Sequence, residues 1–238
     1  MLEVKNYNSS ILHEISFSLK ENENLIILGQ NGAGKSTLAK VMSNLITNDK
    51  VELFGRNISD ISDYDRAKLI NYIPPKLSIF DEYITLREFL ELSFVSNVDN
   101  EKVDKIIKLL KIRKLEHKFC NSFSSGEKQL LLLASAIIHD AKITIFDELT
   151  ANLDINRLKE VYDIFNSNLM QQKIIITHNL DLAYALKYKI LFINDGIIEF
   201  FGEHDEFFKN ENLKKFYNDS IQKVNNHLVV NLWKRYCL

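Results

Sequence analysis

With 238 residues and 46% apolar side chains, the chain is long enough for one large domain that carries an inserted subdomain. Its formal net charge of -2 lacks the basic excess of a general nucleic-acid binder, so we expect no nucleic-acid partner. Cys120 and Cys237 stand far apart without other ligands at metal-binding spacing, which indicates neither a disulfide framework nor a zinc site and fits a reducing cytosol.

No signal-peptide pattern opens the sequence, and its longest nearly apolar stretch is 130–138. That stretch is far shorter than the roughly 20 residues that a membrane-spanning helix needs. If the protein works at a membrane, we therefore expect it to act from the surface, through the helices of another protein.

The first third of the chain alternates short apolar runs with helical patterns. An apolar run that ends at a glycine predicts a buried parallel strand, and a glycine-rich loop and a helix follow it. The predicted elements are a strand at 25–28, a helix at 35–46, a strand at 51–54, a helix at 63–70 and a strand at 70–73.

Pro74 and Pro75 end regular structure, because proline lacks the backbone donor and restricts the residue before it. From 85 to about 115, apolar residues recur at steps of three and four, which is typical of helices. We therefore expect a helical subdomain at 76–139, after which the chain rejoins the core at a second buried strand, 143–146.

The last third predicts one more buried strand and two hairpins. The strand spans 173–177. The turn residues 194–196 (Asn-Asp-Gly) separate apolar runs at 190–193 and 197–200, and Asn225–Asn226 separate runs at 221–224 and 228–232. Strands that alternate with helices predict an α/β fold with a mostly parallel sheet and antiparallel β additions.

Residues 29–37 match the phosphate-binding P-loop pattern in full, with a strand before it and a helix after it. Glycines let backbone N–H groups approach a polyphosphate, and the helix N-terminus adds free donors and a favourable dipole. A chance match to a glycine-rich turn is the alternative. The candidate nucleotide-binding residues here are Gly29, Asn31, Gly32, Ala33, Gly34, Lys35, Ser36 and Thr37.

Two of these side chains have separate roles. Lys35 is expected to reach the β- and γ-phosphates of ATP, and Ser36 is expected to offer its hydroxyl to Mg²⁺. Together with its flanking strand and helix, this loop predicts a P-loop ATPase core.

Asp147 and Glu148 end the predicted strand 143–146. Asp147 is placed to hold Mg²⁺ or its waters, and Glu148 could polarise an attacking water as general base. The alternative is a solvated strand end. His178 follows the strand 173–177, where it would face the ligand crevice and touch the γ-phosphate or orient the base; the alternative is a structural histidine.

The segment 123–129 (Phe-Ser-Ser-Gly-Glu-Lys-Gln) opens the apolar run 130–138. Ser124, Ser125 and Gly126 could form a second anion site from a hydroxyl and helix N-terminal N–H groups. The alternative is an ordinary serine-capped helix start.

The order and spacing of the P-loop, 123–129, Asp147–Glu148, 151–154 and His178 resemble those of ABC nucleotide-binding domains. The resemblance covers nearly the whole chain, as a single ABC domain over 1–238. It implies two domains paired head to tail, each ATP held between the P-loop of one and Ser124 to Gly126 of the other. It also places Asp154 with 151–154 along that interface.

The same resemblance assigns Tyr7 to an aromatic position that stacks on adenine, against the alternative of an ordinary strand tyrosine. It further implies a homodimer of ATP-binding domains that works with integral membrane permease subunits, and a periplasmic or extracellular binding protein in the same system. The expected location is then peripheral, on the cytoplasmic face of the inner membrane.

A finer resemblance rests on 58–61, 65–74 and the tail segment 207–217 with the hairpin after it. These segments are similar to the ATP-binding subunits of iron-siderophore, haem and cobalamin importers. They predict import of iron complexes or cobalamin, with other small solutes as the alternative.

Four positions depart from the family pattern. Pro75 stands where a glutamine normally links the γ-phosphate and Mg²⁺ to the membrane partner, and Glu127 places a negative charge near a phosphate. Ser125 and Leu149 replace a glycine and a proline. The chain is therefore either a working motor or a nucleotide-binding regulatory or structural subunit with weak hydrolysis. A third possibility is a soluble ABC ATPase that acts on ribosomes or DNA.

Overall fold

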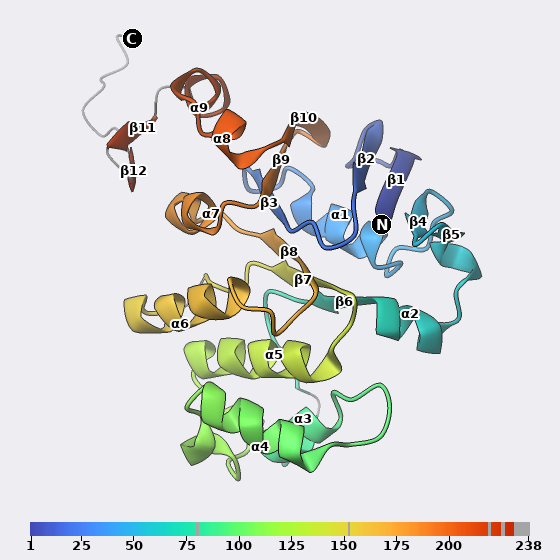
Figure 1. Ribbon diagram of the computed structural model, residues 1–238, viewed down its shortest axis with the longest axis vertical. Coiled ribbons are helices and arrows are strands. Elements are labelled where there is room, and N and C mark those ends of the chain that lie inside the picture. Colours follow the sequence, from blue (N-terminus) through green and yellow to red (C-terminus); the bar gives the residue numbers. More distant parts are fainter. Residues whose placement is uncertain (80, 152, 219, 225–226, 231–238) are drawn as a thin grey trace.

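A six-stranded sheet forms the centre of the molecule and positions every candidate site residue that follows a strand (Figure 1). The computed structural model describes residues 1–79, 81–151, 153–218, 220–224 and 227–230. Five strands are parallel, and β10 pairs antiparallel with β9. In spatial order the strands are β10 (Ile197–Gly202), β9 (Lys189–Asn194), β3 (Leu25–Gly29), β8 (Gln172–Ile176), β7 (Ile143–Asp147) and β6 (Ile70–Ile73).

The inner strands of this sheet are apolar on both faces because both faces are covered. In β3, Leu25 and Ile27 belong to one core cluster, and Ile26 and Leu28 belong to the other. This division follows from the two-residue period of a strand, which sends successive side chains to opposite faces. The continuous apolar runs in the sequence are therefore the mark of a doubly covered parallel sheet.

A second, antiparallel sheet covers one face, with helix α1 (Lys35–Met42) supplying core residues between the two sheets. Its strand β2 alternates buried and exposed positions, as expected of a sheet with one face in water. The strand order is β2 (Ile15–Leu19), β1 (Leu2–Tyr7), β4 (Val51–Leu53) and β5 (Arg56–Asn57). Sequence analysis assigned no strand to β1 or β2.

Helices cover the opposite face. Helix α5 (Ser125–His139) is buried from Gln129 to Ile138, so it is a central helix. Figure 1 shows α3 and α4 on the side of α5 that faces away from the sheet. The same core takes side chains from α3 (Leu86–Glu91), α4 (Asn100–Leu109), α6 (Ile155–Phe165), α7 (Leu180–Leu186), α8 (His204–Phe207) and α9 (Asn210–Tyr217). Helix α2 (Asp63–Leu69) instead packs Leu69 against the core on the side of the antiparallel sheet. Short 3₁₀ turns lie at Ile58–Asp60, Arg113–Leu115 and Cys120–Ser122.

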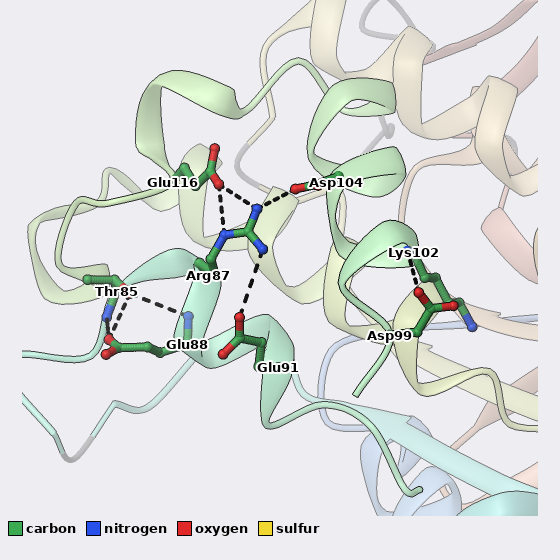
Figure 2. Close-up of polar contacts among 8 residues, drawn as sticks. All are labelled: Thr85, Arg87, Glu88, Glu91, Asp99, Lys102, Asp104 and Glu116. Carbon is green, nitrogen blue, oxygen red and sulfur yellow. Dashed lines mark hydrogen bonds and ion pairs between the residues drawn. The ribbon is translucent and has the colours of Figure 1, made fainter. Parts of the chain in front are cut away.

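Arg87 links α3 to α4 and to the turn that follows α4 (Figure 2). Its Nε donates to Glu116 at 2.8 Å, and its guanidinium also pairs with Asp104 and with Glu91 of its own helix. Glu116 is only 8% exposed, so its charge needs this partner. The network therefore fixes the geometry of the region predicted as a helical subdomain at 76–139, whose boundaries remain a prediction.

Most predicted elements are present, with boundaries shifted by a few residues. The predicted helix 35–46 ends at Met42, and the strand predicted at 173–177 spans Gln172–Ile176. The hairpin of β9 and β10 is confirmed. The last hairpin pairs β11 (Ile221–Val224) with β12 (His227–Val230); its expected turn, 225–226, and residues 231–232 lie outside the described residues.

In the described part of the chain, no helix combines the length and the apolar character that a membrane span requires.

Candidate functional site

The predicted phosphate loop connects β3 to α1 in a conformation that needs its glycines. Gly29 has φ of +152°, and a Cβ there would lie 2.1 Å from the carbonyl oxygen of Ile193 on the next strand. Gly34, directly before α1, has φ of +100°. Positive φ is readily adopted only by glycine. The loop therefore presents the N-terminus of α1 at the carboxyl edge of the sheet.

Lys35 is the one charged residue of the loop 29–37, and it is buried, with 6% exposure. Its Nζ donates to the carbonyl oxygens of Gly29 (3.0 Å) and Gln30 (2.8 Å). Burial lowers the pKa of Lys35, and the charges of Glu148 and Asp147 oppose that shift. The structure thus brings together the three charged residues that sequence analysis predicted at separate points of the chain.

The remaining loop residues divide into exposed and structural positions. Asn31, Gly32 and Ser36 are exposed, and Thr37 is half-buried. Ala33 is buried: its N–H donates to Gln30, and its carbonyl accepts from Gly196 in the β9–β10 hairpin. The hairpin therefore supports the loop from behind, while the exposed positions face solvent.

Asp147 is fully buried at the end of β7. Its Oδ2 accepts a hydrogen bond from the Tyr72 hydroxyl at 2.9 Å, and its Oδ1 has no partner among the described residues. Burial raises the pKa of Tyr72 above its ordinary value, and the charge of Asp147 raises it further, so the hydroxyl stays protonated and donates. An unpaired buried carboxylate oxygen is an incomplete arrangement, and it suits a cation ligand.

Glu148 and His178 lie together at the ends of the adjacent strands β7 and β8. His178 Nδ1 is 3.7 Å from Glu148 Oε1, and the imidazole is more exposed (58%) than the carboxylate (29%). The Glu148 backbone has φ of +52° and donates to the carbonyl of Ile176. A left-handed glutamate is uncommon.

The segment 124–127 caps helix α5. The Glu127 carboxylate accepts from the N–H and the hydroxyl of Ser124, both at 2.9 Å, and the Ser124 hydroxyl accepts from the Glu127 N–H at 3.3 Å. This capping box lowers the pKa of Glu127, chiefly through the Ser124 N–H. The Glu127 carboxylate and the Ser124 hydroxyl therefore both hydrogen-bond within the cap of α5.

Three predicted site residues lie in other settings. Ser125 and Gly126 form the first turn of α5, and Asp154 caps α6 by accepting from the N–H of Arg157 at 3.0 Å. Within the described ranges, no hydrogen bond or ion pair joins 124–126 or Asp154 to the phosphate loop. Asn152, in the predicted interface segment 151–154, lies outside the described residues.

Tyr7 does not present a free ring. It lies at the end of β1, is 8% exposed, and belongs to the core between the two sheets. Stacking on adenine requires an open aromatic face, so this burial favours the alternative of a strand tyrosine. The adenine-stacking role that the resemblance implies for Tyr7 therefore stays a prediction, because a motif position carries no information about packing.

Sequence reasoning missed two polar residues near the site. One is Tyr72, whose hydroxyl donates a hydrogen bond to Asp147. The other is Gln129 of α5, which is 4% exposed and donates through Nε2 to the carbonyl of Pro75 at 3.0 Å. A glutamine side chain therefore does reach Pro75, from another element. Neither contact has a local sequence signal, because Tyr72 and Asp147 are 75 residues apart and Gln129 and Pro75 are 54 apart.

Comparisons with known proteins show which family the chain belongs to. A profile of the ABC transporter family matches residues 12–151. An uncharacterized ABC transporter ATP-binding protein of Methanocaldococcus jannaschii is 31% identical over 87% of this chain and 85% of its own length. The chain belongs to the ABC transporter family: it is an ATP-binding subunit of the ABC type, and it is an ATPase.

Two further similarities define the extent of the match. The lactococcin-A transport/processing ATP-binding protein of Lactococcus lactis is 31% identical over 83% of this chain, which spans only 29% of that protein. A solved ATP-binding subunit of an ABC transporter superposes with a TM-score of 0.78 at 22% identity, over 91% of this chain and 98% of the other. The α/β P-loop fold predicted from the sequence is confirmed.

Proposed function

We propose that ATP binds with its phosphates on the loop 29–37 and that Mg²⁺ is held by Ser36 and Asp147. The exposed Ser36 hydroxyl and the unpartnered Asp147 Oδ1 are oxygen donors of the kind Mg²⁺ takes together with substrate phosphates. When bound, the ion would neutralise charge on the phosphates. Lys35 would leave the carbonyls of Gly29 and Gln30 to meet the phosphates.

Glu148 is the general base in this proposal, and His178 orients it. The observation that carries the proposal is that Lys35, Asp147 and Glu148 converge at one edge of the sheet, with His178 3.7 Å from Glu148. A carboxylate that is 29% exposed can hold a water, and a neighbouring imidazole restricts its rotation.

Steady-state ATPase assays of wild type against Glu148→Gln and His178→Ala test these roles. We expect turnover to fall at least 100-fold in Glu148→Gln while ATP binding is retained, and 10-fold or more in His178→Ala, as is typical of lost general-base catalysis. Wild-type turnover no faster than that of Glu148→Gln would contradict the motor and favour the regulatory subunit with weak hydrolysis.

We further propose that two copies pair head to tail, each receiving the ATP of the other at Ser124, Ser125 and Gly126. The support is that this segment opens the 15-residue helix α5, whose first N–H groups can receive an anion. Glu148→Gln with ATP should then dimerise in light scattering. A monomer at all concentrations, with and without a membrane partner, would contradict the pairing.

The transported cargo that we propose is an iron complex, imported through a permease with an external binding protein. The support is the similarity of 58–61, 65–74 and 207–217 to iron-siderophore and haem importers. In this arrangement the chain sits peripherally on the cytoplasmic face of the membrane. Affinity purification from detergent extracts should recover a many-helix permease, and deletion of the gene should lower uptake of a radioactive ferric siderophore. Unchanged iron uptake, with the permease recovered, would point to another solute or to export.

A further inference from the structure

The Tyr72 hydroxyl reaches Asp147 from the neighbouring strand. Strands β6 and β7 are parallel, and Tyr72 lies beside Ile145, two residues before Asp147. Two strand residues span about 6.6 Å, which a tyrosine side chain covers when it leans along its strand. The hydroxyl ends 2.9 Å from Asp147 Oδ2 and donates to it.

This hydrogen bond determines which oxygen of Asp147 stays available. Asp147 is 0% exposed, so its carboxylate has no water shell to hold it, and Oδ1 has no partner among the described residues. Lys35 does not take this place, because its Nζ donates to two carbonyl oxygens of the loop. In the part of the chain that the structure describes, Tyr72 is thus the only side chain that hydrogen-bonds Asp147.

We propose that Tyr72 is a positioning residue for the metal site: by binding Oδ2, it orients the Asp147 carboxylate so that Oδ1 faces the Mg²⁺ and its waters. The inference rests on the proposed function, which assigns Asp147 to Mg²⁺. Partners of metal ligands fix the orientation of those ligands, and their loss typically weakens metal affinity 10- to 100-fold.

A structural role is the competing explanation. Tyr72 also lines a surface cavity with Ser43, Arg66 and His139, so its ring could simply fill the space beside the edge strand. Tyr72→Phe separates the two, because it keeps the ring and removes only the hydroxyl. Tyr64→Phe is the matched control, since Tyr64 is 56% exposed on helix α2.

The experiment measures the Mg²⁺ concentration that gives half of the thermal stabilisation by AMP-PNP, a nucleotide that is not hydrolysed. We expect this concentration to rise about 10-fold in Tyr72→Phe. The affinity for AMP-PNP in EDTA should stay within about twofold of wild type, because only the metal-dependent part of binding changes. Tyr64→Phe should match wild type in both measurements.

A double mutant checks that the effect passes through Asp147. In an Asp147→Asn background, Tyr72→Phe should cause no further change in the Mg²⁺ midpoint. An unchanged midpoint in the single variant, or an equal shift in both backgrounds, would overturn the inference. A lower Tm and a weaker affinity for AMP-PNP in EDTA, with an unchanged Mg²⁺ midpoint, would also overturn it, because that result marks a packing role. If wild type itself shows no Mg²⁺ dependence, the metal assignment fails, and the role of Tyr72 fails with it.

Discussion

At the scale of single residues, the most informative departure from the family pattern is Glu127. The sequence places the negative charge of Glu127 near an expected phosphate. In the structure, the Glu127 carboxylate accepts hydrogen bonds from Ser124 and so caps the start of α5. Any anion that approaches the Ser124 hydroxyl must then displace or tolerate this carboxylate.

We therefore predict that Glu127→Gln strengthens ATP-driven pairing. Glutamine keeps the capping geometry, so Tm should stay within about 2 °C, while removal of a charge worth about 1 kcal/mol should lower the dimer dissociation constant about fivefold. Light scattering in the Glu148→Gln background measures this. A matched Glu88→Gln, in the capping box of α3, should leave pairing unchanged; equal effects of both changes would contradict the idea.

Cys120 offers a second residue-scale prediction. It is fully buried, and burial raises the pKa of its thiol to about 11. Because the thiolate is the reactive form, iodoacetamide at pH 8 should label Cys120 at least 100-fold more slowly in the folded protein than in urea. The assay uses a Cys237→Ser chain, and mass spectrometry counts the label. Rapid labelling of the folded protein would show that this region opens readily.

At the scale of elements, Arg87 joins three segments of the helical region. We predict that Arg87→Met lowers the free energy of unfolding by about 1–2 kcal/mol, because it leaves the nearly buried Glu116 without its cation. Urea unfolding measures the change. Arg113→Met, at an exposed position, should cost less than about 0.5 kcal/mol. If Arg87→Met lowers the free energy of unfolding no more than Arg113→Met does, water replaces the contacts of Arg87 and the network adds no stability.

Elements also show how far the sequence carries the prediction. Buried strands such as 25–28 and 143–146 were predictable because a doubly covered strand needs an unbroken apolar run. Strands β1 and β2 were missed, since their short alternating pattern is weak without the sheet that it faces. Helix α1 stops at Met42, before the helical pattern ends, and Asn44 just beyond it takes the left-handed conformation, with φ of +58°.

The candidate site divides in the same way. Lys35, Asp147, Glu148 and His178 were found because each follows a strand that ends at the same sheet edge. Tyr72 and Gln129 were not, because their roles depend on contacts between elements that are distant in sequence. Local patterns reveal what a strand presents at its own end, and they do not reveal which neighbour touches it.

At the scale of the whole molecule, large apolar side chains remain exposed in the helical region. Tyr83 is 71% exposed, Leu92 is 75% exposed, and Phe119 packs edge-on against Tyr83 while 48% exposed. We predict that a membrane permease docks on residues 76–94 together with Phe119, since exposed apolar side chains in one region mark interaction surfaces.

Leu92→Glu should then lower the share of the protein recovered with membranes at least fivefold, while the ATPase activity of the purified chain stays unchanged. The control is Leu45→Glu, an exposed leucine beyond the end of α1 (62%). Quantitative immunoblots of membrane and soluble fractions measure the share of each variant that is recovered with membranes. Equal membrane recovery for both variants would place the docking surface elsewhere.

The left-handed backbone at Glu148 is strained, and interactions elsewhere in the folded protein must offset that strain. With φ of +52°, a residue with an ordinary side chain is less favourable there than asparagine or glycine by roughly 1 kcal/mol. Glu148→Asn should therefore be about 0.5–1 kcal/mol more stable than Glu148→Gln in urea unfolding, although both lack the carboxylate. A copy of this gene released from its catalytic task would be expected to drift away from glutamate at this position and gain stability as it did so. In the proposed function, this position therefore keeps a general base at the expense of stability.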